Sequence, residues 1–273
     1  MIDSRICSVC AWREQCKKRF SSKSDSLVHC PDYSRDVKIK NTDSRLVEYQ
    51  LGKWQAEKRE KGPNITISRE TGSGGSEIAR ILARDLDMDL MGGQIISKVA
   101  ESARMSSKVV ETLDEKAMSN LDSWINSLFT SRHLWPDVYL RHLTKVIAAI
   151  GEHGNAVIVG RGAHFILAAE SAFRIRFISP MEIRVRRIMR DRGISREEAK
   201  QYITKRDSDR ASFARKYFNA DMSDPSHYDL VLNTDALGIE KAAQSAKEAF
   251  LSWKSLRSSA GKPTSAHSEV PAR

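Results

Sequence analysis

The chain has 273 residues, 40% of them hydrophobic, so it is long enough to bury a core and too apolar to be disordered throughout. No stretch approaches the roughly 18 consecutive apolar residues of a membrane span, and no apolar signal region follows Met1, so we expect a soluble, cytoplasmic protein without a membrane partner. The net charge is +10, but residues 1–63 and 251–273 contribute surpluses of 5 and 3, so charge does not indicate a nucleic-acid-binding core.

The first 37 residues carry every cysteine of the chain and few apolar side chains. Four thiolates suit tetrahedral Zn²⁺, and the free energy of metal binding would fold a segment that has no core of its own. We therefore predict a structural zinc knuckle in residues 1–37, with an iron–sulfur cluster, suggested by Cys30-Pro31, or unmetallated thiols as alternatives. The predicted ligands are Cys7, Cys10, Cys16 and Cys30, with His29 as a substitute.

The same segment interleaves basic side chains, such as Arg13 and Lys17, with the aromatic rings of Trp12 and Phe20. A small metal module of this composition can track a nucleic-acid backbone and stack its bases. The same residues can equally form a solvated face that docks on the rest of the protein. The sequence leaves both interpretations open.

A linker helix is predicted over residues 38–63, because apolar residues recur at near-helical spacing until Gly62-Pro63 ends the pattern. Beyond it, short β-branched runs alternate with helical patterns. Strands are predicted at 64–68, 156–160, 174–179 and 229–233, with a weaker one at 87–91. Helices are predicted at 76–86, through 106–152 with an interruption near Pro136, and at 181–192, 196–218 and 238–253. This alternation predicts a parallel sheet covered on both faces in a domain of residues 64–254, followed by a disordered tail at 255–273.

A glycine-rich segment lies between the first predicted strand and the helix that follows it, residues 68–76, which read Ser-Arg-Glu-Thr-Gly-Ser-Gly-Gly-Ser. Strand, glycine-rich turn and helix form the geometry in which backbone N–H groups surround a phosphate. Against the P-loop pattern G-x-x-x-x-G-K-[ST], Gly74 and Ser76 fit, but Arg69 stands at the first glycine and Gly75 at the lysine. A tight turn without a ligand is the plainer alternative.

The loop resembles the Ser-Arg-Glu-x-Gly-Ser-Gly-Gly loop of the cytidylate kinase-like family, a branch of the nucleoside monophosphate kinases. The resemblance covers about residues 64 to 250 and includes further segments in the expected order: Gly160-Arg161-Gly162, residues 178–187 and residues 205–211. It implies a three-layer α/β P-loop kinase fold with a parallel sheet and a helical lid, preceded by the small four-cysteine metal knuckle. It also implies transfer of a phosphoryl group from ATP, with Mg²⁺, to a nucleoside monophosphate such as CMP or dCMP.

The resemblance assigns roles to individual residues. Arg184 and Arg187 would act on the transferring phosphoryl group. Because Arg69 flanks the loop, we further expect it to act with Arg184 and Arg187 in place of the missing lysine. Asp207 would accept a hydrogen bond from the cytosine amino group. The ATP phosphates would be bound by Thr71, Gly72, Ser73, Gly74, Gly75 and Ser76, with Mg²⁺ held partly by the Ser76 hydroxyl. The acceptor would be bound by Arg161, Asp207, Arg210 and Gln94. In the plainer interpretation, the basic helix at 181–192 is a solvated face with ion pairs to Glu182, Glu197 and Glu198.

One departure from the P-loop pattern and two from the family pattern keep other functions open. The P-loop lysine is absent at Gly75, glycine stands at Gly162 where the family has aspartate, and the usual acidic residue near Gly92 is missing. One alternative is a nucleotide-sensing or nucleic-acid-binding regulator that keeps the fold but not the reaction. Another is a kinase whose acceptor is a small molecule other than a nucleotide.

Overall fold

The computed structural model describes residues 62–93, 96–97, 100 and 138–260. The cysteine segment, nearly all of the predicted linker helix, Gln94 and the first part of the predicted 106–152 helical region lie outside these residues. The predictions made for them therefore stay predictions.

Five parallel strands form a single sheet in the order β2-β3-β1-β4-β5. The strands are β1 (Asn64–Arg69), β2 (Asp89–Gly92), β3 (Ala156–Val159), β4 (Ala172–Ile178) and β5 (Leu230–Asn233). β1 lies near the middle and is almost completely buried, which explains its run of β-branched residues. The predicted parallel sheet is confirmed, including the weak strand that became β2.

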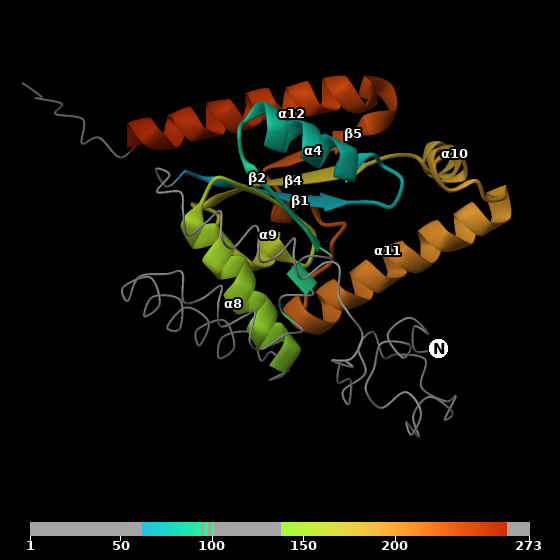
Figure 1. The fold of residues 1–273 in the computed structure, drawn as a ribbon, viewed down its shortest axis with the longest axis horizontal. Coiled ribbons are helices and arrows are strands. Elements are labelled where there is room, and N and C mark those ends of the chain that lie inside the picture. Colours follow the sequence, from blue (N-terminus) through green and yellow to red (C-terminus); the bar gives the residue numbers. More distant parts are fainter. Residues whose placement is uncertain (1–61, 94–95, 98–99, 101–137, 261–273) are drawn as a thin grey trace, which may run out of the picture.

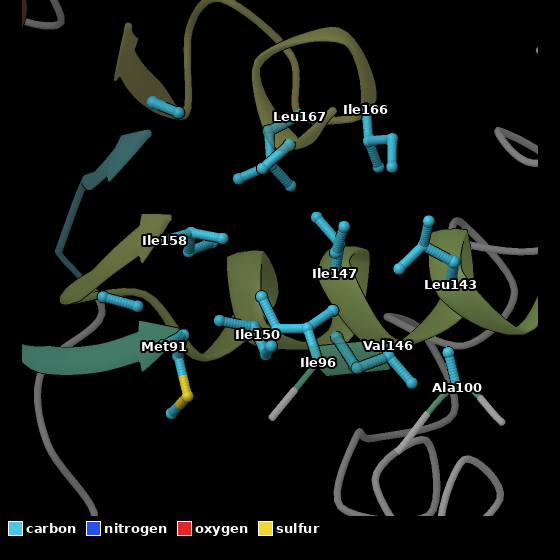
Figure 2. Packing of buried hydrophobic residues seen from close by; sticks show 14 of the residues in the cluster. Met91, Ile96, Ala100, Leu143, Val146, Ile147, Ile150, Ile158, Ile166 and Leu167 are labelled. Atoms are coloured by element: carbon cyan, nitrogen blue, oxygen red, sulfur yellow. The ribbon is translucent and has the colours of Figure 1, made fainter. Parts of the chain in front are cut away.

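Helices cover both faces of this sheet (Figure 1). One face carries α4 (Gly75–Asp85) and α12 (Thr234–Ala260), and the other carries α8 (Val138–His153) and α9 (Ala163–Ile166). Successive residues of β3 point to opposite faces: Val157 packs with α4 and α12, whereas Ile158 packs with α8 and α9. Figure 2 shows Ile158 among the buried side chains of α8 and α9.

A helical hairpin, α10 (Met181–Arg192) and α11 (Arg196–Phe218), follows β4 and has a small core of its own. Ser195 begins α11 with a capping box to Glu198, and Asn219 ends it in the left-handed conformation. The last residues of α11, Tyr217 and Phe218, are buried in the core beside α8. In Figure 1, α11 therefore runs from α10 to the side of the sheet where α8 and α9 lie.

The end of the chain differs from the prediction for residues 238–253. The last described helix begins at Thr234, breaks at Gly238 (φ 70°, ψ 177°) and continues to Ala260, so the first residues of the predicted tail are helical. The Arg257 guanidinium in this added stretch lies 4.6 Å from the centroid of the Trp253 ring, at the end of the predicted helix. A short 3₁₀ helix, η1 (Pro225–His227), precedes β5. Among the described helices, none is long and apolar enough to cross a membrane.

Candidate active site

The loop between β1 and α4 is shaped by two glycines in the left-handed region, Gly72 (φ 82°) and Gly74 (φ 84°). The Ser73 hydroxyl donates to the Glu70 carbonyl at 2.9 Å, and the Thr234 hydroxyl donates to the Ser73 carbonyl at 2.6 Å. No side chain caps the N-terminus of α4. The loop therefore presents a helix N-terminus without a side-chain cap at the carboxyl edge of the sheet, an environment that favours a phosphate.

Arg69 and Gly75 depend on each other in this loop. A Cβ atom at Gly75 would lie 2.7 Å from the Arg69 Cβ and 3.2 Å from the Phe177 Cβ, so a lysine has no room there while Arg69 is present. The Arg69 Nε donates to the Ser76 hydroxyl at 3.4 Å, which places its charge near the start of α4. Arg69 thus brings a cation to the loop that lacks the usual lysine.

The charge of Arg69 is unfavourable in the absence of an anion. Burial, followed by the nearby charges of Arg210, Arg161 and Arg206, lowers the pKa of Arg69 to about 9. Burial is also the main cause of the lowered pKa of Arg210. Clustered guanidiniums of this kind gain stability when a bound anion supplies the opposite charge.

Arg161 lies two residues after the end of β3 in a strained backbone. It has φ 54° between Gly160 (φ 80°) and Gly162 (φ 70°), a conformation that costs a non-glycine residue about 1–2 kcal/mol. Its exposed side chain donates from Nε to the Gly93 carbonyl at 3.2 Å. Strain at the carboxyl end of a strand in an open α/β sheet is typical of a ligand-binding position.

Close packing against the Phe218 ring also favours glycine at position 162. A Cβ atom there would lie 2.7 Å from the Phe218 Cζ, and closer still to another atom of the same ring. The aspartate that the family pattern has at this position therefore does not fit beside Phe218. The end of α11 takes up the space instead.

Arg184 of α10 is buried, with 7% of its surface exposed, between two carboxylates. Its Nη1 lies 2.5 Å from Asp207 Oδ2, and its Nε lies 3.6 Å from Glu70 Oε2. Nη1 also approaches the Thr71 carbonyl at 3.5 Å. Arg184 is therefore held against the loop by charge on both sides.

Asp207 and Arg210 of α11 reach the same loop residue. Asp207 Oδ1 accepts from the Thr71 N–H at 2.9 Å and from the Thr71 hydroxyl at 2.8 Å. Arg210 donates to the Thr71 hydroxyl and, at 3.4 Å, to Asp207 Oδ1. The two side chains lie one turn apart on one face of α11, so they contact the loop together.

Arg187 binds the backbone on the other side of the loop. It donates to the Gly72 carbonyl at 3.3 Å, to the Thr234 hydroxyl at 3.0 Å and to the Thr234 carbonyl at 3.3 Å. It thereby connects α10, the loop and the start of α12. The interpretation of α10 as a solvated face applies to its outer residues, where exposed Glu182 pairs with Arg196.

The structure thus gathers most of the predicted site residues around the loop, at one edge of the sheet. Gln94 lies outside the described residues. Two residues that the sequence analysis did not single out also take part. Glu70 accepts from the Ser179 N–H at 3.0 Å and lies beside Arg184, and Thr234 links the loop to Arg187. Two sequence signals could have identified these residues. Glu70 stands inside the glycine-rich loop motif, and Thr234 directly follows the strand β5.

The donor set of the loop fits ATP and Mg²⁺. Glycines at positive φ let the backbone approach phosphates closely, and the exposed Ser76 hydroxyl is an oxygen ligand of the kind that Mg²⁺ takes. Within residues 62–93, 96–97, 100 and 138–260, no group of three or more His, Cys, Asp or Glu side chains is placed to hold a metal ion. The cysteines lie outside these ranges, so the zinc site is still a prediction.

The five-stranded parallel sheet, its glycine loop and the basic hairpin that closes on the loop define an α/β protein of the P-loop kinase type. A sequence profile of the cytidylate kinase-like family matches residues 64–236. The chain belongs to this family. Membership of this family supports a kinase-type phosphotransferase that uses ATP and Mg²⁺.

Several relatives of known name are similar to most of the chain. The cytidylate kinase of Ignicoccus hospitalis is 28% identical over 188 residues, which cover 68% of this chain and 98% of that protein. The cytidylate kinase of Natronomonas pharaonis is 29% identical over 191 residues, which cover 68% of this chain and 90% of that protein. A crystal structure of an uncharacterized protein from Eubacterium ventriosum shares the fold, with a TM-score of 0.56 and 23% identity over 70% of this chain and 99% of that one.

Proposed function

We propose that the protein transfers the γ-phosphoryl group of ATP to a nucleoside monophosphate and that the acceptor is CMP or dCMP. The observation that carries this proposal is the cluster of Arg69, Arg161 and Arg210 at the loop, in which the charges of the other two add to the burial that lowers the pKa of Arg69, and in which the Nε of Arg210 is buried without a hydrogen-bond partner among the described residues. A buried charged donor without a partner is costly, and a phosphate in this place would supply the missing acceptor. The names of the relatives support cytosine as the acceptor base.

ATP would bind with its phosphates on residues 71–76 and the N-terminus of α4. Mg²⁺, held by the nucleotide and partly by the Ser76 hydroxyl, would neutralise charge on the phosphates. Arg69 would do for this loop what the P-loop lysine does elsewhere, because it brings a cation to the start of α4. No protein nucleophile is needed, since an oxygen of the acceptor phosphate attacks the γ-phosphorus in line.

The acceptor phosphate would bind between β3 and α11. Arg161 and Arg210 approach this place from the two sides, and both add to the charge that lowers the pKa of Arg69. A phosphate dianion between them would offset that repulsion. Gln94 stays a proposed contact of the acceptor. Arg184 and Arg187, bound to the loop from α10, would stabilise the transferring group.

The proposal is tested by incubating the protein with Mg²⁺-ATP and each nucleoside monophosphate in turn and measuring ADP and nucleoside diphosphate. We expect CDP or dCDP, and we expect Arg161→Ala to lower kcat/KM for the acceptor about a hundredfold, since the loss of a charged contact in a closed site costs about 3 kcal/mol. The matched control is Arg196→Ala, an exposed arginine that pairs with Glu182 away from the loop. It should leave kcat/KM unchanged.

A different acceptor is the second candidate, because Phe218 fills the space where the family has an aspartate. ATP binding with turnover of a phosphorylatable small molecule, but of no monophosphate, would favour it. ATP binding without any turnover would favour a nucleotide-sensing regulator and would contradict the proposed reaction.

A further inference from the structure

We infer that Asp207 positions the phosphate-binding loop and does not read the acceptor base. This inference rests on the proposed function, because it concerns how the same site distinguishes acceptors. It departs from the role that the family resemblance suggests for Asp207, in which the carboxylate accepts a hydrogen bond from the cytosine amino group.

The oxygens of Asp207 are already engaged by the protein. Oδ1 accepts from the N–H and the hydroxyl of Thr71, at 2.9 and 2.8 Å, and from Arg210 at 3.4 Å. Oδ2 accepts from Arg184 at 2.5 Å. Each carboxylate oxygen has about two lone-pair sites, so the three donors to Oδ1 already exceed its capacity, and the single contact of Oδ2 is a charged one with buried Arg184. An exocyclic amino group of a base could use only the second lone pair of Oδ2, so most of the hydrogen-bonding capacity of Asp207 serves the protein.

The middle of α11 has little else to hold it. The buried residues of α11 are Ala199, Ile203, Ala214, Tyr217 and Phe218. No buried residue lies between Ile203 and Ala214, and this is the stretch that carries Asp207 and Arg210. Apart from the partly buried Phe213 at its end, polar contacts with Thr71 therefore take the place of apolar packing in this stretch. Loss of the Asp207 carboxylate would detach the middle of the helix from the loop.

Asp207 also belongs to a set of contacts that fixes successive loop residues from the hairpin. Arg184 lies beside Glu70, Asp207 binds Thr71, and Arg187 binds the Gly72 carbonyl. The nucleotide phosphates would meet a loop whose shape is set by α10 and α11 together. Because this effect acts on the loop, its loss should weaken ATP binding and slow the reaction equally for every acceptor.

The test compares Asp207→Asn and Thr71→Val with the wild type, using ATP with CMP and with UMP. Each variant should lower kcat/KM at least about tenfold with both acceptors, keep the CMP/UMP ratio within about twofold, and raise the KM for ATP. The double variant should lose much less than the product of the two single losses, because both remove the same contact. Asp209→Asn, an exposed neighbour on α11, is the matched control and should behave as wild type.

A CMP/UMP ratio that changes about tenfold in Asp207→Asn, with the KM for ATP unchanged, would overturn the inference. If the wild type phosphorylates no monophosphate, the proposed function fails, and the inference is then decided by ATP binding and thermal unfolding. In that case, weaker ATP binding and non-additive losses of Tm in Asp207→Asn and Thr71→Val would support it. Wild-type ATP affinity in both variants would overturn it. Thr71→Val keeps the side-chain shape, so it tests the inference even where Asp207→Asn folds poorly.

Discussion

His164 is a buried histidine on α9 that the proposed reaction does not use. Its ring centroid lies 3.9 Å from that of Phe165 and 5.0 Å from that of Tyr228, and its Nε2 is buried without a hydrogen-bond partner among the described residues. Burial is the main cause that lowers the pKa of His164 to about 3, and the charges of His227, Arg176 and Arg174 add to it. The folded protein therefore keeps this imidazole neutral through most of the acid range.

The lowered pKa of His164 predicts a loss of stability in acid. Between about pH 6.5 and pH 3 the unfolded chain binds a proton at this residue and the folded chain does not, so the free energy of unfolding falls as the pH falls, by up to about 1.4 kcal/mol per pH unit. His164→Phe keeps an aromatic ring in place and removes the contribution of this histidine to the pH dependence of stability. Between about pH 7 and about pH 5, we expect the free energy of unfolding, measured in urea, to fall by about 2 kcal/mol less in the variant than in the wild type. Equal differences in the two proteins would contradict the assignment.

At the scale of elements, the contacts in the turn from β1 into α4 oppose a lysine at position 75. Gly75→Lys would place a Cβ atom 2.7 Å from the Arg69 Cβ, an overlap that lies at the backbone end of both side chains. Overpacking of this kind costs about 1–3 kcal/mol. We expect a corresponding fall in the free energy of unfolding for Gly75→Lys, measured in urea, and partial recovery in Arg69→Gly/Gly75→Lys. A stable single variant would show that the turn relaxes more easily than its contacts indicate.

The elements themselves follow well from the sequence, and the contacts between them do not. Runs of β-branched residues located the strands to within a few residues, and the start of α11 at Ser195 and Glu198 follows the capping pattern. Arg161 stood out because it follows a strand. The partner of Asp207 is Thr71, 136 residues away, and no local spacing encodes that contact. The helix beyond Trp253 was missed because its serine-rich sequence has no apolar period.

At the scale of the whole molecule, the α10–α11 hairpin is a separate unit. Its core of Val185, Ile188, Ala199 and Ile203 is distinct from the two cores that flank the sheet. The hairpin contacts the glycine-rich loop after β1 through polar side chains, and the end of α11 enters a main core. A unit with a small core opens more easily than the sheet on which it closes.

Ligand binding should therefore stabilise the hairpin more than the sheet. We expect Mg²⁺-ATP to slow amide hydrogen exchange in α10 and α11 by a larger factor than in β1 and β4, because the nucleotide phosphates would add contacts to the loop that the hairpin grips. Hydrogen exchange read out by mass spectrometry on the same protein, with and without the nucleotide, measures this difference. Uniform slowing in all these elements would show that the hairpin and the sheet open together.

The crowding of Arg69 against Gly75 also restricts how such a loop can change over generations. A lineage that exchanges a glycine and lysine loop for this arginine and glycine pair, one codon at a time, has two routes. Gaining the arginine first sets two side chains in the same space, whereas losing the lysine first leaves a folded protein whose turn lacks a cation. Either intermediate therefore has a defect, in packing or in charge, so the two positions are expected to change together. A single substitution at either one does not convert one kind of loop into the other.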